Sequence, residues 1–187
     1  CYKALCTLGK LEPAALAQHA GAVVERLQDE RFQLRVVALT TLGKLDPSAL
    51  AQHAGAVVAR LEDSGDIVRV HALHTLGKLE PTTLALYADA VVAWLTVSFD
   101  WCVRVAALQT LGTLEPRTLV QYAADVIARL EDDDSFVRRS ALETLAKLEP
   151  ATLVQYAGVV VARLEDPSGD YGDWRVRKAA LETLSRL

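Results

Sequence analysis

The sequence repeats itself with a period of about 34 residues. The segment Leu-Gly-Lys-Leu-Glu-Pro that begins at Leu8 returns four more times in closely similar form. Its prolines, at 13, 47, 81, 116 and 150, are spaced 34, 34, 35 and 34 residues apart. A sixth copy, residues 184–187, stops before its proline. This period is typical of solenoids, in which each copy is one supersecondary unit and neighbouring copies bury a shared core.

Each copy predicts two helices joined by a short polar turn. Pro13 suits the first position of a helix, and the acidic residue before it, Glu12, is expected to cap that helix. We expect Asp100, Asp134 and Asp173 to cap second helices. Apolar residues recur at helical spacing in both helices (Leu16, Ala20, Val23, Val24 and Leu27 in the first; Leu34, Ala38, Thr41, Leu42 and Leu45 in the second). No segment alternates with a period of two, so we predict an all-α fold.

The second helices share a signature near their start. An apolar residue is followed by arginine and, three residues later, by alanine, as in Leu34, Arg35 and Ala38. This pattern resembles the Val-Arg-x-x-Ala motif of HEAT repeats, whereas the Trp, Leu-Gly and Tyr pattern of tetratricopeptide repeats is absent. The resemblance covers essentially the whole chain. It implies a right-handed α-solenoid of about five stacked antiparallel helix pairs plus a partial leading helix, with short units like those of phycobilin-lyase-like HEAT proteins.

We expect one array over residues 1–187. The predicted units are about 1–11 (partial), 12–45, 46–79, 80–114, 115–148 and 149–187. Position 1 corresponds to Arg35, so Leu5, Leu8 and Leu11 are expected to face an absent neighbour. We therefore interpret the chain as a fragment of a longer array, and end-to-end self-association through uncapped terminal units is the alternative.

A charged pair accompanies the signature. HEAT repeats also carry an aspartate six residues before the arginine, as Asp29 is before Arg35. In the third unit we assign Val97 to the aspartate position, and an insertion places Asp166 eleven residues before Arg177. Because active sites are not copied along an array, we interpret the charges as a structural ladder of ion pairs and turn-capping contacts. Its members are Asp29, Arg35, Asp63, Arg69, Arg104, Asp132, Arg138 and Arg177.

Composition excludes several classes of function. The net charge is −4 and the isoelectric point about 5.6, so no overall basic field favours nucleic acid. No apolar run reaches membrane-spanning length, and we expect no membrane partner. Cys1, Cys6 and Cys102 show no disulfide framework, which predicts an intracellular, cytoplasmic protein.

We predict no catalytic residue, cofactor or metal site. His71 and His74 are three residues apart on one second helix and could share a metal ion, but no third ligand is near in the sequence. The glycines occur singly, and the sequence contains no His-Glu dipeptide of the kind used by HEAT-like iron hydroxylases. A HEAT-like enzyme or lyase subunit and a structural spacer in a larger assembly remain the alternatives to a binding protein.

The outward side of the second helices is the first candidate binding surface. In HEAT arrays it lines the concave face, and here it changes from apolar and neutral to strongly charged along the chain. Such a surface favours an extended peptide or a helix over a phosphate backbone. We call these residues the second-helix stripe: Val36, Thr40, Lys44, Val70, His74, Lys78, Val105, Gln109, Thr113, Arg139, Glu143, Lys147, Lys178, Glu182 and Arg186.

The third unit departs most from the other copies. Trp94 replaces a recurrent arginine, Leu86 replaces a recurrent glutamine, and Phe99 and Trp101 stand in or beside a turn that is acidic elsewhere. Exposed aromatic residues are common anchors of interfaces, so we predict a scaffold that binds another protein or peptide. The insertion at 166–172 is predicted to project as a loop. The candidate binding residues are Trp94, Phe99, Trp101, Val70, His74, Lys78, Val105 and Gln109.

Overall fold

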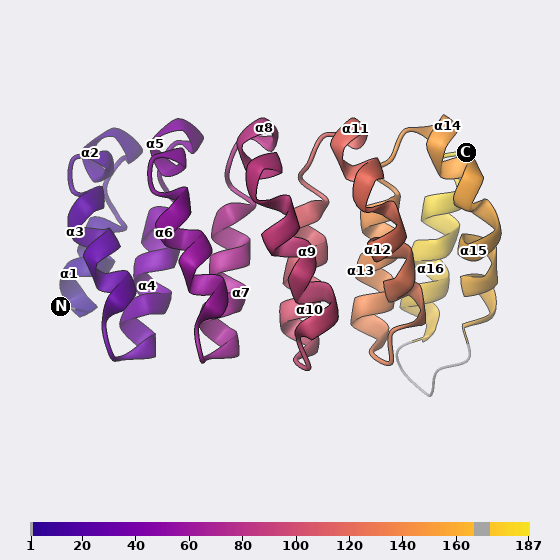
Figure 1. Ribbon diagram of the computed structural model, residues 1–187, viewed down its shortest axis with the longest axis horizontal. Coiled ribbons are helices and arrows are strands. Elements are labelled where there is room, and N and C mark those ends of the chain that lie inside the picture. The colour runs from indigo at the N-terminus through magenta and orange to yellow at the C-terminus, as the bar shows by residue number, and fades with distance from the viewer. Residues whose placement is uncertain (1, 167–172) are drawn as a thin grey trace. The chain divides into compact units, whose positions relative to one another are not determined.

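The computed structural model describes residues 2–166 and 173–187 (Figure 1). Within these ranges the regular elements are all helices, and no strand occurs, which confirms the all-α prediction. The loop predicted at 166–172 lies outside the described residues, apart from Asp166.

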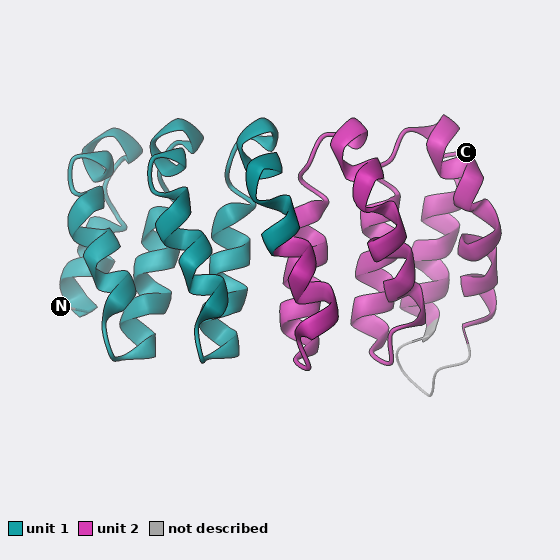
Figure 2. Ribbon diagram, viewed as in Figure 1, with its two compact units in different colours: residues 1–90 teal, residues 91–187 magenta. Residues whose placement is uncertain are grey.

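The chain divides into two compact units, Cys1–Ala90 and Val91–Leu187 (Figure 2). The division falls inside helix α9 (Ala88–Val97). The first unit contains α1 (Tyr2–Leu8), α2 (Pro13–Ala17), α3 (Ala20–Glu25), η1 (Arg26–Gln28), α4 (Phe32–Leu42), α5 (Pro47–Ala51), α6 (Ala54–Val58), η2 (Ala59–Glu62), α7 (Asp66–Leu76), α8 (Pro81–Leu84) and η3 (Ala85–Tyr87). The second unit contains most of α9 and then α10 (Trp101–Leu111), α11 (Pro116–Leu119), η4 (Val120–Tyr122), α12 (Ala123–Ala128), η5 (Arg129–Glu131), α13 (Ser135–Leu145), α14 (Pro150–Leu153), η6 (Val154–Tyr156), α15 (Ala157–Val161), η7 (Ala162–Glu165) and α16 (Asp173–Leu184).

Second helices pack side by side within each unit. In the first unit α4 contacts both α1 and α7, and in the second unit α13 contacts both α10 and α16. Each also packs on the first helix of its own copy, as α13 does on α12 and η5. Because neighbours cover three sides of such a helix, it buries Leu34, Ala38 and Leu42 on one side and Leu39 on another. This helix-pair repeat is the α-solenoid architecture that the sequence predicts, while its right-handedness stays a prediction.

The first helix of each copy is broken, which the sequence did not predict. After one turn that begins at proline, the chain passes through a residue outside the helical region, such as Tyr122 with φ −105° and ψ 7°. His53 occupies the same position with φ −115° and ψ 4°. A short 3-10 turn also closes the helix before the polar turn, as η5 does. The spacing of apolar residues therefore predicts where the first helix begins and ends, but it does not predict the break inside the helix.

The helix starts confirm one sequence expectation and correct another. Pro13 and Pro47 take the first helical positions as expected. Glu12 and Asp46 occupy the cap position in extended conformation, but their side chains accept no capping hydrogen bond. Side-chain length does not account for this, because the aspartate at 46 and the glutamate at 12 both make no capping hydrogen bond. Asp100 does cap α10, and its carboxylate accepts from two backbone N–H groups.

Leucine and valine side chains fill the interior of both units. Leu16, Leu50 and Leu84 are buried in the first unit, as are Leu108 and Leu142 in the second. The expectation that the first leucines face an absent neighbour was wrong for one of them. Leu5 is 3% exposed because α1 packs on α4, whereas Leu11 is 38% exposed.

Candidate functional site

Arg35 joins its own turn to the following copy. Its Nη1 donates to the carbonyl oxygens of Asp29 and Glu30 at 2.8 and 2.9 Å. Its Nε and Nη2 donate to the two carboxylate oxygens of Asp63 at 2.7 and 2.8 Å. The backbone N–H of Gly65 donates to Asp63 as well, at 3.1 Å. One guanidinium thus closes a turn and makes a bidentate ion pair across two copies, which is the geometry that arginine favours.

The same arrangement occurs twice in the second unit. Arg104 donates to the carboxylate of Asp132 at 2.9 and 2.7 Å, and Arg138 donates to that of Asp166 at 2.8 and 2.9 Å. In all three pairs the aspartate follows the arginine by 28 residues. Arg138 and Asp166 are 5% and 3% exposed, so this pair is shielded from water. These five ladder residues, Arg35, Asp63, Arg104, Asp132 and Arg138, therefore join neighbouring copies.

Other ladder residues make local contacts. Asp29 accepts from the side chain and backbone of Arg31, which lower the pKa of its carboxyl to about 2. Arg69 donates to the carboxylate of Asp66 and to the carbonyl oxygen of Asp63. Arg177 donates to the carbonyl oxygen of Asp166 at 3.4 Å, so it reaches the start of the insertion.

The assignment of Val97 to the aspartate position was wrong. Arg104 donates to the carbonyl oxygens of Ser98 and Phe99, at 3.0 and 3.1 Å, as Arg35 does to those of Asp29 and Glu30. Ser98 is therefore the residue that corresponds to Asp29. The third copy of the repeat (residues 80–114) has one more residue between its proline and its signature arginine than the other copies up to 148 have, and α9 continues to Val97. Ser98 lies six residues before Arg104, as Asp29 lies six before Arg35, so the assignment of Val97 was one residue too early.

Burial and hydrogen bonding shift the pKa of the Asp63 carboxyl in opposite directions. Burial alone would raise the pKa of its carboxyl, but the hydrogen bond from the Arg35 side chain and that from the Gly65 backbone lower it. The net effect is a pKa below the ordinary value, so Asp63 is ionised at neutral pH.

The second-helix stripe of the first unit is exposed but partly engaged in local contacts. Val36 and Val70 are half-buried, whereas His74 and Lys78 are exposed. Lys44 donates to the carbonyl oxygen of Gly9 and so covers the end of α1.

The two histidines of α7 lie close together. The rings of His71 and His74 have centroids 6.5 Å apart in an edge-to-face arrangement. Burial, and then the neighbouring His74, lower the pKa of His71 below its usual value. In residues 2–166 and 173–187 no group of three or more side chains of His, Cys, Asp or Glu is placed to hold a metal ion.

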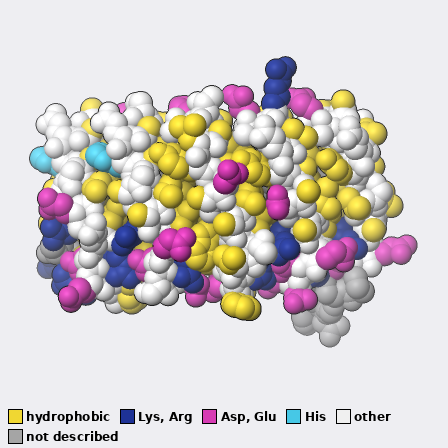
Figure 3. Space-filling view, in the orientation of Figure 1, with side chains coloured by type: hydrophobic (Ala, Val, Ile, Leu, Met, Phe, Trp, Pro, Cys, Tyr) yellow, Lys and Arg dark blue, Asp and Glu magenta, His cyan; other side chains and the backbone are white. Residues whose placement is uncertain are grey.

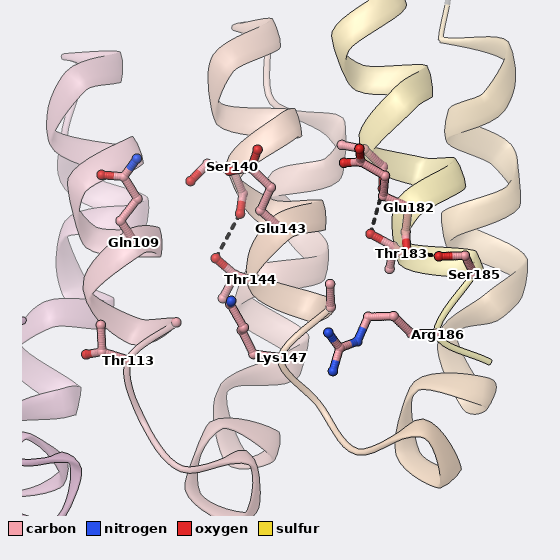
Figure 4. A pocket seen from close by; sticks show the side chains of 13 residues that line it. Gln109, Thr113, Ser140, Glu143, Thr144, Lys147, Glu182, Thr183, Ser185 and Arg186 are labelled. Carbon is pink, nitrogen blue, oxygen red and sulfur yellow. Dashed lines mark hydrogen bonds between the residues drawn. The ribbon is translucent and has the colours of Figure 1, made fainter.

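In the second unit the stripe lines a pocket of about 620 Å³ (Figure 4). Its walls come from the ends of α10, α13 and α16. The stripe residues that line it are Gln109, Thr113, Glu143, Lys147, Glu182 and Arg186. Val105 is half-buried on the same helix as Gln109.

Small side chains beneath the stripe leave room for this pocket. Ser140 and Ala179 line it, and each stands two residues after the signature arginine of its copy. The same position holds Val37 and His71 in the first unit. Sequence reasoning missed Ser140 and Ala179, although this change from large to small residues was the signal for them.

A smaller pocket of about 120 Å³ adjoins the first between α13 and α16. It shares Glu143, Ala179 and Glu182 with the larger pocket and adds Arg139, Trp174, Arg175 and Lys178. We call the two pockets together the α13–α16 groove.

The aromatic residues of the third copy of the repeat differ in their surroundings. Phe99 is 102% exposed, and Val97 beside it is 60% exposed. Trp101 stacks on Phe136 of the next copy, with ring centroids 5.1 Å apart and an interplanar angle of 25°. Trp94 is half-buried on α9, over which hydrophobic side chains gather in Figure 3. Sequence reasoning missed Phe136, although both stacked rings lie at the start of a second helix.

A pocket of about 350 Å³ lies beside Phe99. Ser98, Arg104 and the acidic residues Glu131 and Asp133 also line it. This turn therefore offers an apolar side chain next to exposed carboxylates.

The repeated helix pairs and the arginine–aspartate pairs define an α-solenoid. A family model described as HEAT repeats matches residues 88–185, which is more than half of the chain. The chain belongs to the family of HEAT repeats. No curated protein matches the sequence.

Among the described residues, no helix is both long enough and apolar enough to cross a membrane.

Three known structures that this chain resembles are distant from it in sequence. A homology model of the full-length AP-3 complex matches 98% of this chain with a TM-score of 0.81 and 19% identity, and the match spans 34% of that chain. The complex of CpcE and CpcF of phycocyanin lyase from Nostoc sp. has a TM-score of 0.67 and 16% identity, over 89% of this chain and 98% of that one. Computationally designed armadillo repeat proteins for modular peptide recognition have a TM-score of 0.67 and 17% identity, over 99% and 92%. At this level of identity the similarity concerns the fold.

Proposed function

We propose that this chain is a non-catalytic scaffold that binds another protein or a peptide. The binding surfaces are its second-helix stripe and the turn of the third copy of the repeat, which contains Phe99. The observation that carries the proposal is the full exposure of Phe99, at 102%. Aromatic residues are enriched in interfaces relative to the rest of the protein surface. Phe99 and the exposed Val97 beside it together form apolar surface at this turn, and contiguous apolar surface of this kind marks interaction sites.

Residues that recur in most copies and residues that differ between copies have different surroundings, and this supports the same proposal. Residues that recur in most copies are used within the stack, as Arg35 and Asp63 are in the ladder. Thr144 likewise donates across copies to the carbonyl oxygen of Leu108, at 3.1 Å. Residues that differ between copies, such as Phe99 and Glu143, face outward. Binding specificity is thus located where the copies disagree.

Photo-crosslinking tests this proposal. A benzoyl-phenylalanine placed at position 99 keeps the aromatic ring, and the same group at 109 reports on the second-helix stripe. Position 154 serves as the control, because Val154 is 56% exposed on a first helix. In an extract of the source cells, we expect one defined partner to crosslink from 99 and 109 and not from 154. Equal crosslinking from all three positions, or from none, would contradict the proposal.

The purified partner then gives the quantitative test. Phe99→Ala should weaken binding by about 30-fold, which corresponds to about 2 kcal/mol for an anchor residue. The thermal midpoint of the variant should equal that of the wild type, because the ring makes no packing contribution. A lyase-type subunit would instead show turnover of a small molecule that Phe99→Ala leaves unchanged, and a structural spacer would show no dependence on Phe99.

A further inference from the structure

We propose that the α13–α16 groove binds an extended peptide segment of a partner in which acidic, basic and acidic side chains occupy alternate positions. This inference rests on the proposed scaffold function and names the chemistry of one ligand for it. It is carried by the order of charges along the groove, by their spacing and by a buried hydroxyl in its floor.

The walls of the groove carry the same order of charges twice. Along α13 the order is Arg139, Glu143 and then Lys147 just beyond the helix end, each four residues from the last. Along α16 it is Lys178, Glu182 and then Arg186 just beyond the helix end. In Figure 4 the two glutamates lie at one level of the groove, and Lys147 and Arg186 lie together at another. The groove thus presents a basic, an acidic and a basic level.

The glutamates already form ion pairs with the basic residues of the first level, one pair along each helix. Arg139 Nε donates to Glu143 at 2.7 Å, and Lys178 Nζ lies 3.4 Å from Glu182. Both pairs are largely open to water, at 42% and 43% exposure of the side chains in the first pair. Such pairs contribute little to stability, so a ligand can replace one partner at small cost. Lys147 and Arg186, at the far level, are exposed as well.

The spacing of the levels matches an extended chain. Four residues of helix rise by about 6 Å, which is the spacing between the first level and the level of the glutamates. Lys147 and Arg186 follow two residues after their helices end and lie at the next level in Figure 4. Two residues of an extended strand rise by about 6.4–6.8 Å, and their side chains point to the same face. Side chains at positions one, three and five of an extended peptide can therefore meet the three levels in turn, with acid, base and acid as the complement.

A buried hydroxyl favours an extended chain over a helix. Ser140 is 3% exposed, and its Oγ has no hydrogen-bond partner among the described residues. It lines the pocket at the level of the Gln109 amide (Figure 4). An unmet polar group of this kind costs free energy, which a ligand with free backbone N–H and C=O groups can recover. A helical ligand has already paired its backbone groups, and its radius keeps them about 5 Å from the surface it touches.

Three synthetic peptides test the proposal on the full 187-residue chain. The sequences are Asp-Val-Lys-Val-Asp, Lys-Val-Asp-Val-Lys and Asp-Val-Asp-Val-Asp, each blocked at both ends and measured by isothermal titration calorimetry. The first should bind at least about tenfold more tightly than either of the others. Net charge cannot produce this preference, because a chain of net charge −4 would attract the second peptide most strongly.

A matched pair of variants locates the effect. Glu143→Lys with Glu182→Lys makes all three levels basic, so the preferred peptide should change to Asp-Val-Asp-Val-Asp. Glu115→Lys with Glu149→Lys makes the same change of charge at exposed sites outside the groove and should leave the order of affinities unaltered. Ser140→Ala should weaken the first peptide severalfold without changing the order.

Two results would overturn the proposal. The first is equal affinity for the three peptides, or no binding at about 1 mM. The second is a preference that survives the Glu143→Lys and Glu182→Lys change. Crosslinking from position 99 to a partner, together with either result, would show that the scaffold function holds and that the groove proposal alone is wrong.

Discussion

Replacing Asp63 by Asn tests whether the ladder holds neighbouring copies together. The Asp63 carboxylate accepts two hydrogen bonds from Arg35 and one from the backbone of Gly65. An amide is neutral and has a single acceptor oxygen, so Arg35 would lose its ion pair while its side chain stays 12% exposed. The substitution changes neither the size nor the shape of residue 63, and the result therefore reports on charge and hydrogen bonding.

The expected loss of stability follows from these contacts. Removing one member of a buried ion pair costs about 3–5 kcal/mol. Arg35 keeps its hydrogen bonds to the carbonyl oxygens of Asp29 and Glu30, and a little water reaches it, so we expect a loss at or just below the lower end of this range, about 2–3 kcal/mol. At about 2–4 °C per kcal/mol for a chain of this size, the thermal midpoint should fall by about 4–12 °C.

Far-UV circular dichroism during thermal and urea unfolding measures this loss. Repeat proteins can open locally, so amide hydrogen exchange in α4 and α7 is the second readout. Asp29→Asn is the matched control, because Asp29 has the same place in its copy but pairs with the exposed Arg31 of its own turn. It should shift the midpoint much less than Asp63→Asn does.

Two outcomes would refute the reasoning. Equal effects of Asp29→Asn and Asp63→Asn would mean that the contact between copies adds nothing. No effect of Asp63→Asn at all would mean the same. The depressed pKa of Asp63 adds a check on sign. Its stabilising effect is present above the unfolded pKa of about 3.9 and is lost as pH falls through the lower folded value, so wild type and variant should converge in acid.

Two further predictions concern α7 and the aromatic stack. The folded pKa of His71 is lowered by burial and by His74, so the unfolded chain binds more protons and stability should fall as pH drops below about 6.5. His71→Val, which introduces the residue found at position 37, should flatten the urea midpoint between about pH 5.5 and 7.5, and an unchanged slope would contradict this assignment. Trp101→Ala should lower the free energy of unfolding by about 1 kcal/mol through loss of its stack on Phe136. A double-mutant cycle with Phe136→Ala that gives a coupling below about 0.3 kcal/mol would show that the stack contributes nothing.

The helix-pair repeat was predictable because its signals are local. The spacing of the prolines and the apolar period of residues such as Leu34 and Ala38 lie within one copy. The break in the first helix was not predictable in this way, because it depends on the backbone angles of one residue, as at Tyr122. A histidine or tyrosine at that position carries no signal of non-helical angles.

Contacts between copies were harder to predict than those within a copy. The sequence showed aspartate six residues before arginine, but the bidentate partner of Arg35 is Asp63, 28 residues later. Stacking brings these two together, and no spacing within one copy reveals it. The charges of the groove were predicted on the stripe, whereas the space beside them depends on the small side chains of Ser140 and Ala179.

Arg104 holds its turn by the main chain and not by side chains. Its guanidinium binds the carbonyl oxygens of Ser98 and Phe99, groups that every amino acid possesses. The exposed side chains of the turn can therefore change while the turn keeps its position, whereas Ser98 is buried and donates to the carbonyl oxygen of Asp100. A library of variants at the exposed positions 96, 97 and 99 should thus fold as the parent chain does, which makes these positions suitable for grafting new recognition sequences onto the array.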